Sequence, residues 1–415
     1  MGEVVQLPLA RLAGSRPGGP DRDRRDRPEA MPEQRRLWWR IWSAAPGIGW
    51  LRLQRLEDAF GDLEQAWQAD AAALQVALAR PTKLGERGLE RLLAYRASLG
   101  SDPIGAGVRA EARRRWRDPH VLVCGDASLP ATLRELERPP LELHWQGHGS
   151  LWAALRQRKA VAVVGTRRPS RQGEAIARRI GHTLAEAGWP VVSGLAEGVD
   201  AAAHHGCLEA GGRPVGVLGT PLERVYPRHH EALQAQVAQR GLLVSELPAG
   251  TPVRAGHFAA RNRLQVALSC AVVLVECPHG SGALHSARLA WQEGTPLWVV
   301  PADVSRASAA GSNRWLAQGA TALLDPQDLI DSLGQGPLHR PSTTRPSPPR
   351  LAQQAGTISL SEREAALLGA LGTGASLEQL CRSLRQEPGR LCERLLQLEL
   401  AGLVCAEPGL WWRPC

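Results

Sequence analysis

The sequence has little lysine, phenylalanine or tyrosine, and it has no long apolar run. Lys83 and Lys159 are the only lysines among 50 basic side chains, and Phe and Tyr occur twice each against 14 Trp. This use of Arg for Lys and Trp for Phe indicates a G+C-rich genome. No apolar stretch approaches the ~20 residues that span a bilayer, and no secretory signal opens the chain. We therefore expect a soluble, cytoplasmic protein that does not contact membranes.

The eight cysteines do not form a C-x-x-C pair, and their scattered positions in a long chain argue against a disulfide scaffold. Five of them lie in apolar periodic segments and are predicted to be buried, reduced thiols: Cys207, Cys270, Cys277, Cys381 and Cys392. The histidine pairs at 204–205 and 229–230 lack partner cysteines or carboxylates at zinc-site spacing. We expect no metal site.

Nucleotide-cofactor and nucleotidase motifs are also missing. The chain has no G-x-x-x-x-G-K-[ST] loop, which argues against an NTPase motor, and no G-x-G-x-x-G loop followed by an acidic residue, which argues against a nicotinamide or flavin cofactor. Ser193 and Ser281 stand in S-G pairs without a G-x-S-x-G elbow. We expect no cofactor and no catalytic residue.

What the chain does have is positive charge and enough apolar residues for packed domains. Its formal net charge is +9, and 43% of its residues are hydrophobic. A basic protein of this kind favours a polyanionic partner, although the coding bias toward Arg weakens the inference. At 415 residues the chain should divide into several domains.

The pattern along the chain predicts five parts. Residues 1–30 carry Gly, Pro and a mixed-charge run and are predicted to be a disordered tail, with Met31 as the expected true start. A helical domain resembling SAM or helix-hairpin-helix modules is expected over 31–110, and a Rossmann-like domain over 111–333. A Pro-rich linker is predicted over 334–358 and a winged-helix domain over 359–415.

In the helical domain, Pro46-Gly47-Ile48-Gly49 separates two helical segments. It resembles a helix-hairpin-helix turn, in which glycines free backbone N–H groups for a phosphate, and a plain interhelical turn explains it equally well. Five tryptophans of this region are predicted to form its core: Trp38, Trp39, Trp42, Trp50 and Trp67.

From 161 to about 330, short Val/Leu-rich segments alternate with amphipathic helices. Strands that are apolar on both faces, each followed by a helix, predict a doubly wound parallel sheet of the α/β class.

The last segment carries two capping-box patterns, Ser361 with Glu364 and Ser376 with Gln379, and Pro388 suits a helix's first turn. Gly402 is expected to end the third helix, and a β-hairpin is predicted after it. Three helices followed by a two-stranded wing are therefore expected. The third helix balances Arg390 and Arg394 with glutamates, which favours a protein-contact or regulatory module over a DNA-reading one.

Unusual residues of the α/β domain directly follow its strands. Clusters occur at 165–173, 193–200, 246–263 and 279–282. Ligands of open α/β sheets bind outside the carboxyl ends of the strands, so the four clusters should converge on one edge. Small residues, hydroxyls, helix N-termini and Arg predict a phosphate-binding site there.

Two candidates for acid–base chemistry have a structural explanation that we favour. His204 is expected to pack under the phosphate loop, oriented by Asp200 one helical turn earlier. Glu246, after the fourth strand, is expected to order its loop rather than to act as a base.

The motifs VAVVGTRRPS-x-x-G, VVSGLAEGVD-x-x-AH, LLVSE-x-P, F-x-x-RNR and VLVECPHGSGAL over 161–320 resemble the DprA/Smf (DNA-processing) family. The resemblance implies a homodimeric protein that binds single-stranded DNA and loads RecA recombinase during natural transformation. It also implies that the site comprises Gly165, Thr166, Arg167, Ser170, Ser193, Gly194, Arg254, Phe258, Arg261, Asn262, Arg263, Ser281 and Gly282. Phe258 beside a basic groove is a candidate base-stacking residue.

Two other functions compete with this interpretation. The nucleoside-monophosphate phosphoribohydrolases of the LOG type share a Gly-rich loop on such a sheet, but they use a PGGxGT motif with a following carboxylate. Here Gly280-Ser281-Gly282 is followed by Ala283, Leu284 and His285. A transcription factor led by the winged helix is disfavoured by the near-neutral charge of its third helix.

Overall fold

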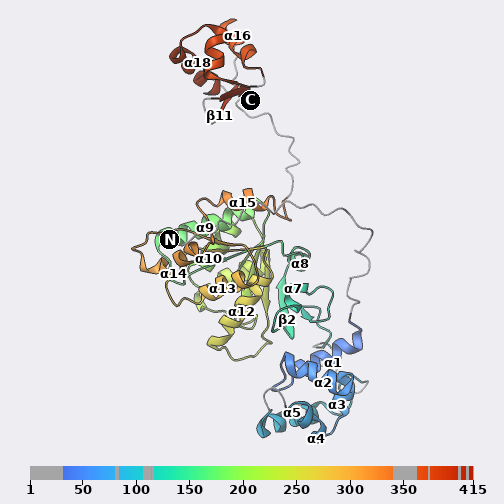
Figure 1. The fold of residues 1–415 in the computed structure, drawn as a ribbon. Helices are drawn as coiled ribbons and strands as arrows, with labels where there is room; N and C mark the ends of the chain where they lie inside the picture. The colour runs from blue at the N-terminus through green and yellow to red at the C-terminus, as the bar shows by residue number, and fades with distance from the viewer. Residues whose placement is uncertain are drawn as a thin grey trace, which may run out of the picture. The chain divides into compact units, whose positions relative to one another are not determined.

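The computed structural model describes residues 31–79, 84–105, 114, 116–339, 362–372, 374–400, 403–407 and 411–414. The chain divides into two compact units, Met1–Arg340 and Pro341–Cys415 (Figure 1). The predicted tail 1–30, most of the predicted linker and Ser361 lie outside the described residues.

The first unit begins with a small helical module whose core is tryptophan. Its helices are α1 (Glu33–Ser43), α2 (Trp50–Phe60), α3 (Leu63–Gln68), α4 (Ala71–Ala77) and α5 (Glu86–Leu99). Asp62 and Asp70 accept a backbone N–H at the starts of α3 and α4, as N-cap aspartates do. Four of the five predicted core tryptophans are buried, and Trp50 is partly buried against them. That prediction is confirmed. Whether the turn at Gly47 meets a phosphate stays a prediction.

The centre of the first unit is a nine-stranded sheet with the order β1-β2-β6-β5-β4-β3-β7-β8-β9. The six strands predicted from the apolar segments are present and pair in parallel: β3 (Val161–Val164), β4 (Val191–Ser193), β5 (Pro214–Leu218), β6 (Leu242–Ser245), β7 (Ala271–Leu274) and β8 (Leu297–Val299). The order runs outward in both directions from β3 and β4, which is the doubly wound arrangement expected from the sequence.

Each central strand is apolar on both faces because helices cover both faces. Val161 and Val163 of β3 pack in the core with α9 (Arg171–Glu186), α10 (Val199–Glu209) and α15 (Gln327–Leu333). Ala162 and Val164 pack in the opposite core with α12 (Ala255–Ala267) and α13 (Ala283–Gln292). Successive side chains of a strand point to opposite faces. The four residues of β3 therefore contribute to the hydrophobic cores on both sides of the sheet.

Three further strands were not foreseen. β1 (Val121–Val123) and β2 (Glu142–Gly147) add antiparallel strands beside β6, and β9 (Thr321–Ala322) closes the other edge. The expectation of an all-parallel sheet is therefore corrected at β1 and β2, whereas β9 pairs in parallel with β8. β2 also holds the helical module, because Glu142 forms a buried ion pair with Arg40 of α1.

The remaining helices of the first unit connect the strands. They are α7 (Ala131–Arg134), α8 (Trp152–Arg156), α11 (Glu231–Arg240) and α14 (Ala310–Ala317), with short 3₁₀ turns η1 (Gly149–Leu151), η2 (Arg228–His230) and η3 (Ala307–Ala309). The predicted boundary between the helical and Rossmann-like domains, at residue 110, falls inside this unit and stays a prediction.

The second unit has the winged-helix composition expected from the sequence. It contains α16 (Glu362–Leu371), α17 (Leu377–Leu384) and α18 (Pro388–Leu400), with β10 (Ala375–Ser376), β11 (Val404–Glu407) and β12 (Trp411–Pro414) in the sheet order β10-β12-β11. The Ser376–Gln379 capping box is formed in both directions, and α18 starts at Pro388 as predicted.

Two of the five predicted thiols are fully buried, Cys207 and Cys277, whereas Cys270, Cys381 and Cys392 are partly exposed. In the part of the chain that the structure describes, no helix has the length and apolar character needed to cross a membrane.

Candidate functional site

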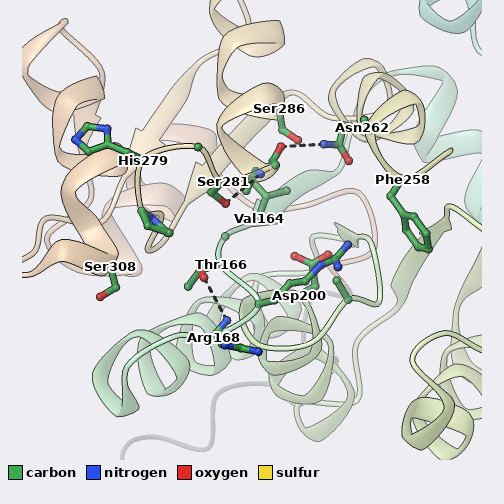
Figure 2. A pocket seen from close by; sticks show the side chains of 18 of the residues that line it. Val164, Thr166, Arg168, Asp200, Phe258, Asn262, His279, Ser281, Ser286 and Ser308 are labelled. Atoms are coloured by element: carbon green, nitrogen blue, oxygen red, sulfur yellow. Dashed lines mark hydrogen bonds between the residues drawn. The ribbon is translucent and has the colours of Figure 1, made fainter. Parts of the chain in front are cut away.

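Loops that follow the parallel strands surround a crevice of about 720 Å³ at the carboxyl edge of the sheet. Its lining comes from the loops after β3, β4 and β7, the starts of α10 and α13, one side of α12 and the η3 turn. Figure 2 shows Thr166 and Arg168 on one side of the crevice and Ser281 and Asn262 on the facing side, with Phe258 at one end. The convergence of separate clusters on one edge is confirmed.

The loop after β3 brings positive charge and exposed backbone to the crevice. Gly165 has no room for a side chain, because a Cβ there would lie 2.6 Å from Val199 Cγ2. The Arg168 backbone N–H donates to Thr166 Oγ1 at 3.2 Å, which shapes the turn. The side chains of Arg167 and Arg168 are exposed. A tight turn carrying two free guanidinium groups suits an anion.

The buried carboxylate of Glu276, two residues after β7, holds the loop after β3 in position. It accepts the Ser170 backbone N–H at 3.1 Å and the hydroxyls of Ser170 and Ser308. Arg306 donates to Ser170 Oγ at 2.7 Å. Burial raises the pKa of Glu276, but the hydrogen bonds from Ser308 and Ser170 and the charge of Arg306 outweigh burial and hold that pKa below its usual range. Glu276 therefore links three loops of the site as an anion.

The loop after β4 is positioned by a buried charge pair. Ser193 is fully buried, and its hydroxyl donates to Val163 O at 2.7 Å. Asp200 accepts the Gly194 N–H at 3.0 Å. The guanidinium of Arg261 packs against Gly194, where any Cβ would collide with it, and donates to Val217 O. Burial lowers the pKa of Arg261 to about 10 despite the opposing charge of Asp200.

Helix α12 presents a partly exposed aromatic ring to the crevice. Phe258 lies beside Gly219, with the guanidinium carbon of Arg167 5.6 Å from its ring centroid. Arg254, at the N-cap of α12, is exposed. Arg263 turns away from the crevice and donates to Glu246 Oε1 at 2.5 Å, so Glu246 orders its loop as expected.

The loop after β7 faces the first loop across the crevice. Asn262 Nδ2 donates to Gly282 O at 3.2 Å, which ties this loop to α12. Gly282 has open space around its Cα, and Ser281 and Gly282 both line the crevice. Backbone groups here remain accessible to a ligand.

Two buried polar side chains that line the crevice lack hydrogen-bond partners among the described residues. They are Gln265, through Nε2, and Ser286, through Oγ, and each is 1% exposed. Buried donors are nearly always satisfied, so a pair of unsatisfied donors at a crevice points to groups that a ligand or water supplies. Gln265 could not be recognised from the sequence, because it lies in an apolar stretch of helix.

The predicted site residues thus fall into two groups. Those that line the crevice are Gly165, Thr166, Arg167, Phe258, Asn262, Ser281 and Gly282. Those that do not line it are Ser170, Ser193, Gly194, Arg254, Arg261 and Arg263. Four residues that line or support the crevice were not predicted as site residues: Gln265, Glu276, Arg306 and Ser308. His204 is fully buried as expected, but neither of its ring nitrogens has a hydrogen-bond partner among the described residues, so the predicted orientation by Asp200 is not seen. Burial lowers the pKa of the His204 imidazole to about 3.

No cluster of three or more His, Cys, Asp or Glu that could hold a metal occurs among the residues with described positions. The crevice is instead built from arginines, hydroxyls, amides and small residues at the switch point of the sheet. These features define a Rossmann-like protein with an arginine- and hydroxyl-lined crevice at the carboxyl edge of its sheet, accompanied by a helical module and a winged helix.

The chain belongs to the DprA/Smf family. The family model described as DNA recombination-mediator protein A matches residues 120–334, and the DprA winged helix domain matches 346–409. Protein Smf of Synechocystis sp. is 31% identical over 404 residues, which cover 92% of this chain and 99% of that protein. The family is one of DNA processing in recombination.

Two solved structures resemble the chain. DNA processing protein A of Streptococcus pneumoniae has a TM-score of 0.58 at 24% identity and covers 71% of this chain and 97% of its own, which supports the fold. DNA processing protein A of Helicobacter pylori, solved for its single-stranded DNA binding mode, has a TM-score of 0.45 at 33% identity. It covers 49% of this chain and 92% of its own.

Proposed function

We propose that this protein binds single-stranded DNA, without catalysing a reaction on it, in the crevice at the carboxyl edge of the sheet. The observation that carries the proposal is the contact of the exposed Arg167 with Phe258 at the end of a crevice in which two buried donors lack partners among the described residues. A cationic groove with an aromatic ring holds unpaired nucleotides, whose base faces are free to stack. In a duplex those faces are already stacked.

Within this proposal the predicted site residues have different tasks. Arg167, Phe258, Asn262, Ser281 and Gly282 contact the strand, with Gly165 and Thr166 offering backbone groups to a phosphate. Arg254 lies exposed at the start of α12 and extends the positive surface. Five residues act by positioning, because each already forms at least one internal hydrogen bond: Ser170, Ser193, Gly194, Arg261 and Arg263.

We further propose that the protein works in the cytoplasm as a homodimer. It would protect incoming single strands and load RecA recombinase on them during natural transformation. The family's role as a recombination mediator supports this step. A phosphoribohydrolase function is not favoured, because the loop after β7 lacks the carboxylate that such enzymes place after the Gly-rich motif.

The test is fluorescence-anisotropy binding of a dT oligomer and of the matching duplex across a salt series. The protein should prefer the single strand, with affinity falling as salt rises. Arg167→Ala should weaken binding and flatten the plot of log K against log salt by about 0.7, the value for one lost phosphate contact on a single strand.

Arg156→Ala is the matched control, since Arg156 is exposed on α8 just before β3, at the opposite edge of the sheet. It should bind like the parent protein. Equal binding of strand and duplex, or an unchanged slope in Arg167→Ala, would refute the proposed site. Absence of DNA binding together with hydrolysis of nucleoside monophosphates would restore the enzymatic alternative.

A further inference from the structure

An aromatic side chain beyond the crevice has no role in the site as described so far. Tyr226 lies in the loop between β5 and η2, and 45% of its surface is exposed. Its ring centroid lies 4.9 Å from that of Phe258, with the two ring planes 48° apart. An exposed tyrosine ring in contact with a site residue is available to a ligand that leaves the crevice on this side.

Phe258 itself has little open face. Gly219 lies so close that a Cβ there would be 2.7 Å from Phe258 Cδ1. The Arg167 guanidinium carbon is 5.6 Å from the ring centroid, and Tyr226 covers a further side. Phe258 is thus only partly exposed, at the end of the crevice, whereas the Tyr226 ring beside it is exposed beyond the crevice.

The loop that carries Tyr226 is held in place by hydrogen bonds. Thr220 Oγ1 donates to Arg224 O at 2.9 Å, and Gln234 Nε2 donates to Leu222 O at 2.9 Å. The Gly250 N–H donates to Glu223 Oε1 at 2.7 Å. A ring presented from a fixed loop loses less conformational entropy when a ligand stacks on it.

The charges around Tyr226 favour a polyanion. Arg224 and Arg228 flank it at two residues on either side, both are exposed, and neither forms an ion pair within the described part of the chain. Two acidic groups of this region already have partners, since Glu223 accepts the Gly250 N–H and Glu197 lies 3.5 Å from His229.

We propose that Tyr226 is a base-stacking residue on which an unpaired base rests, with Arg224 and Arg228 binding the adjoining phosphates. The strand would continue from the crevice across Arg167 and Phe258 to this loop. The inference rests on the proposed single-strand binding and adds a second aromatic contact to it. A base stacked on an aromatic side chain contributes roughly 5- to 100-fold in affinity.

The experiment compares a dT oligomer with an oligomer of equal length that carries tetrahydrofuran abasic sites in place of its bases. Both present the same phosphates, so their affinity ratio measures base contacts alone. The parent protein should prefer the dT oligomer. Tyr226→Ala should reduce this preference by roughly 5- to 100-fold, while binding of the abasic oligomer and its salt dependence stay unchanged.

Two variants serve as controls. Tyr226→Phe keeps the ring and should keep the preference. Trp291→Ala removes an aromatic side chain of nearly equal exposure, 46%, near the end of α13 at the other edge of the sheet, and should leave the preference intact.

The outcomes separate this inference from the proposed function. If the parent protein binds neither oligomer, single-strand binding itself fails. If it binds both equally, or if Tyr226→Ala keeps the full preference for dT, the role of Tyr226 is overturned while phosphate binding stands.

Discussion

At the scale of single residues, burial separated side chains that the sequence placed in one motif. Arg261, Asn262 and Arg263 are consecutive, yet only Asn262 lines the crevice. Arg261 is 6% exposed against Gly194, and Arg263 is bound to Glu246. Helical geometry points successive residues about 100° apart, so one of three neighbours can reach the ligand. A motif gives the location of the site, and the backbone decides which side chain contacts the ligand.

A second residue, His204, predicts how stability depends on pH. Burial lowers its pKa to about 3, well below the value near 6.5 of an unfolded histidine. The folded state therefore resists protonation, and stability is lost as pH falls below 6.5. The expected loss is about 1.4 kcal/mol per pH unit between about pH 6 and pH 4.

Urea unfolding followed by circular dichroism at pH 7 and pH 5 measures this loss. In His204→Gln, the loss of unfolding free energy between pH 7 and pH 5 should be smaller by about 2 kcal/mol than in the parent protein. This holds whatever the effect of the substitution on stability at pH 7. His182→Gln, on the exposed surface of α9, should leave the slope as it was. An unchanged slope in His204→Gln would show that other groups cause acid sensitivity.

At the scale of helices and strands, the sequence predicted the strands whose apolar pattern follows from burial of both faces. The parallel strands are apolar at every position because both faces are covered, as in Val161–Val164. β2 could not be recognised, because ELHWQG is exposed at one end and has no regular alternation. β1 has three residues and β9 two, and strands this short are defined by their partners rather than by their own sequence.

The start of α9 provides an element-scale prediction. Ser170 caps the helix by accepting the Gly173 N–H at 3.0 Å, and it also links Glu276 and Arg306. Ser170→Ala should cost about 1 kcal/mol in amide hydrogen-exchange protection at the first turn of α9 and should weaken dT binding, because the loop before it loses its anchor.

Ser376→Ala is its matched partner, since the Ser376 side chain caps α17 in the second unit by the same kind of hydrogen bond. It should lose similar protection in its own helix, yet bind dT normally. If Ser170→Ala and Ser376→Ala bind dT with the same affinity, the hydrogen bonds between Ser170 and Glu276 do not position the site.

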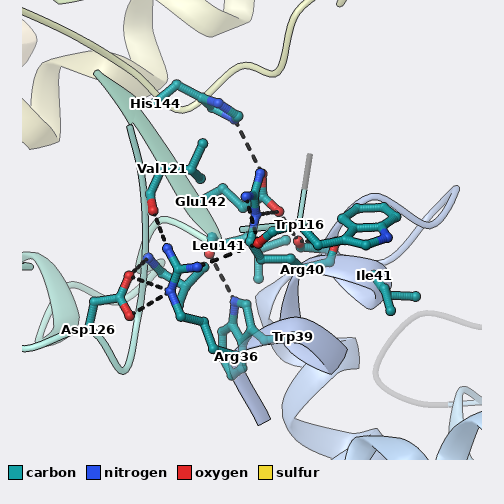
Figure 3. A network of polar contacts seen from close by, with 12 residues as sticks. Arg36, Trp39, Arg40, Ile41, Trp116, Val121, Asp126, Leu141, Glu142 and His144 are labelled. Carbon is teal, nitrogen blue, oxygen red and sulfur yellow. Dashed lines mark hydrogen bonds and ion pairs between the residues drawn. The ribbon is translucent and has the colours of Figure 1, made fainter. Parts of the chain in front are cut away.

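At the scale of the whole molecule, a polar network joins the helical module to the sheet (Figure 3). Arg40 of α1 lies 3.4 Å from Glu142 of β2, and both are buried. His144 Nε2 lies 3.3 Å from the same carboxylate, and Ser43 donates to it at 2.5 Å. Burial raises the pKa of Glu142, but the adjacent His144, Arg40 and Ser43 outweigh burial and lower it. No sequence pattern indicated this contact between residues 102 positions apart.

Removing one member of the pair should be costly. Glu142→Ala leaves the Arg40 charge buried without its carboxylate and should lower the unfolding free energy by about 3–5 kcal/mol. Glu57→Ala, which breaks the more exposed pair with Arg35, should cost about 1 kcal/mol or less. The double variant Arg40→Met with Glu142→Leu should recover most of the loss. A cost below about 1 kcal/mol for Glu142→Ala in urea unfolding would show that the network does not hold the module.

The order of strands in the sheet also affects the tendency of the protein to aggregate. Its Val/Leu-rich parallel strands β3 to β8 are internal, and its outermost strands, β1 and β9, have three and two residues. An edge strand offers unpaired N–H and C=O groups that a strand from another molecule can extend. Edges this short give an incoming strand few backbone hydrogen bonds, so sheet extension into fibrils gains little. The most aggregation-prone segments of the chain are thereby kept away from both open borders of the sheet.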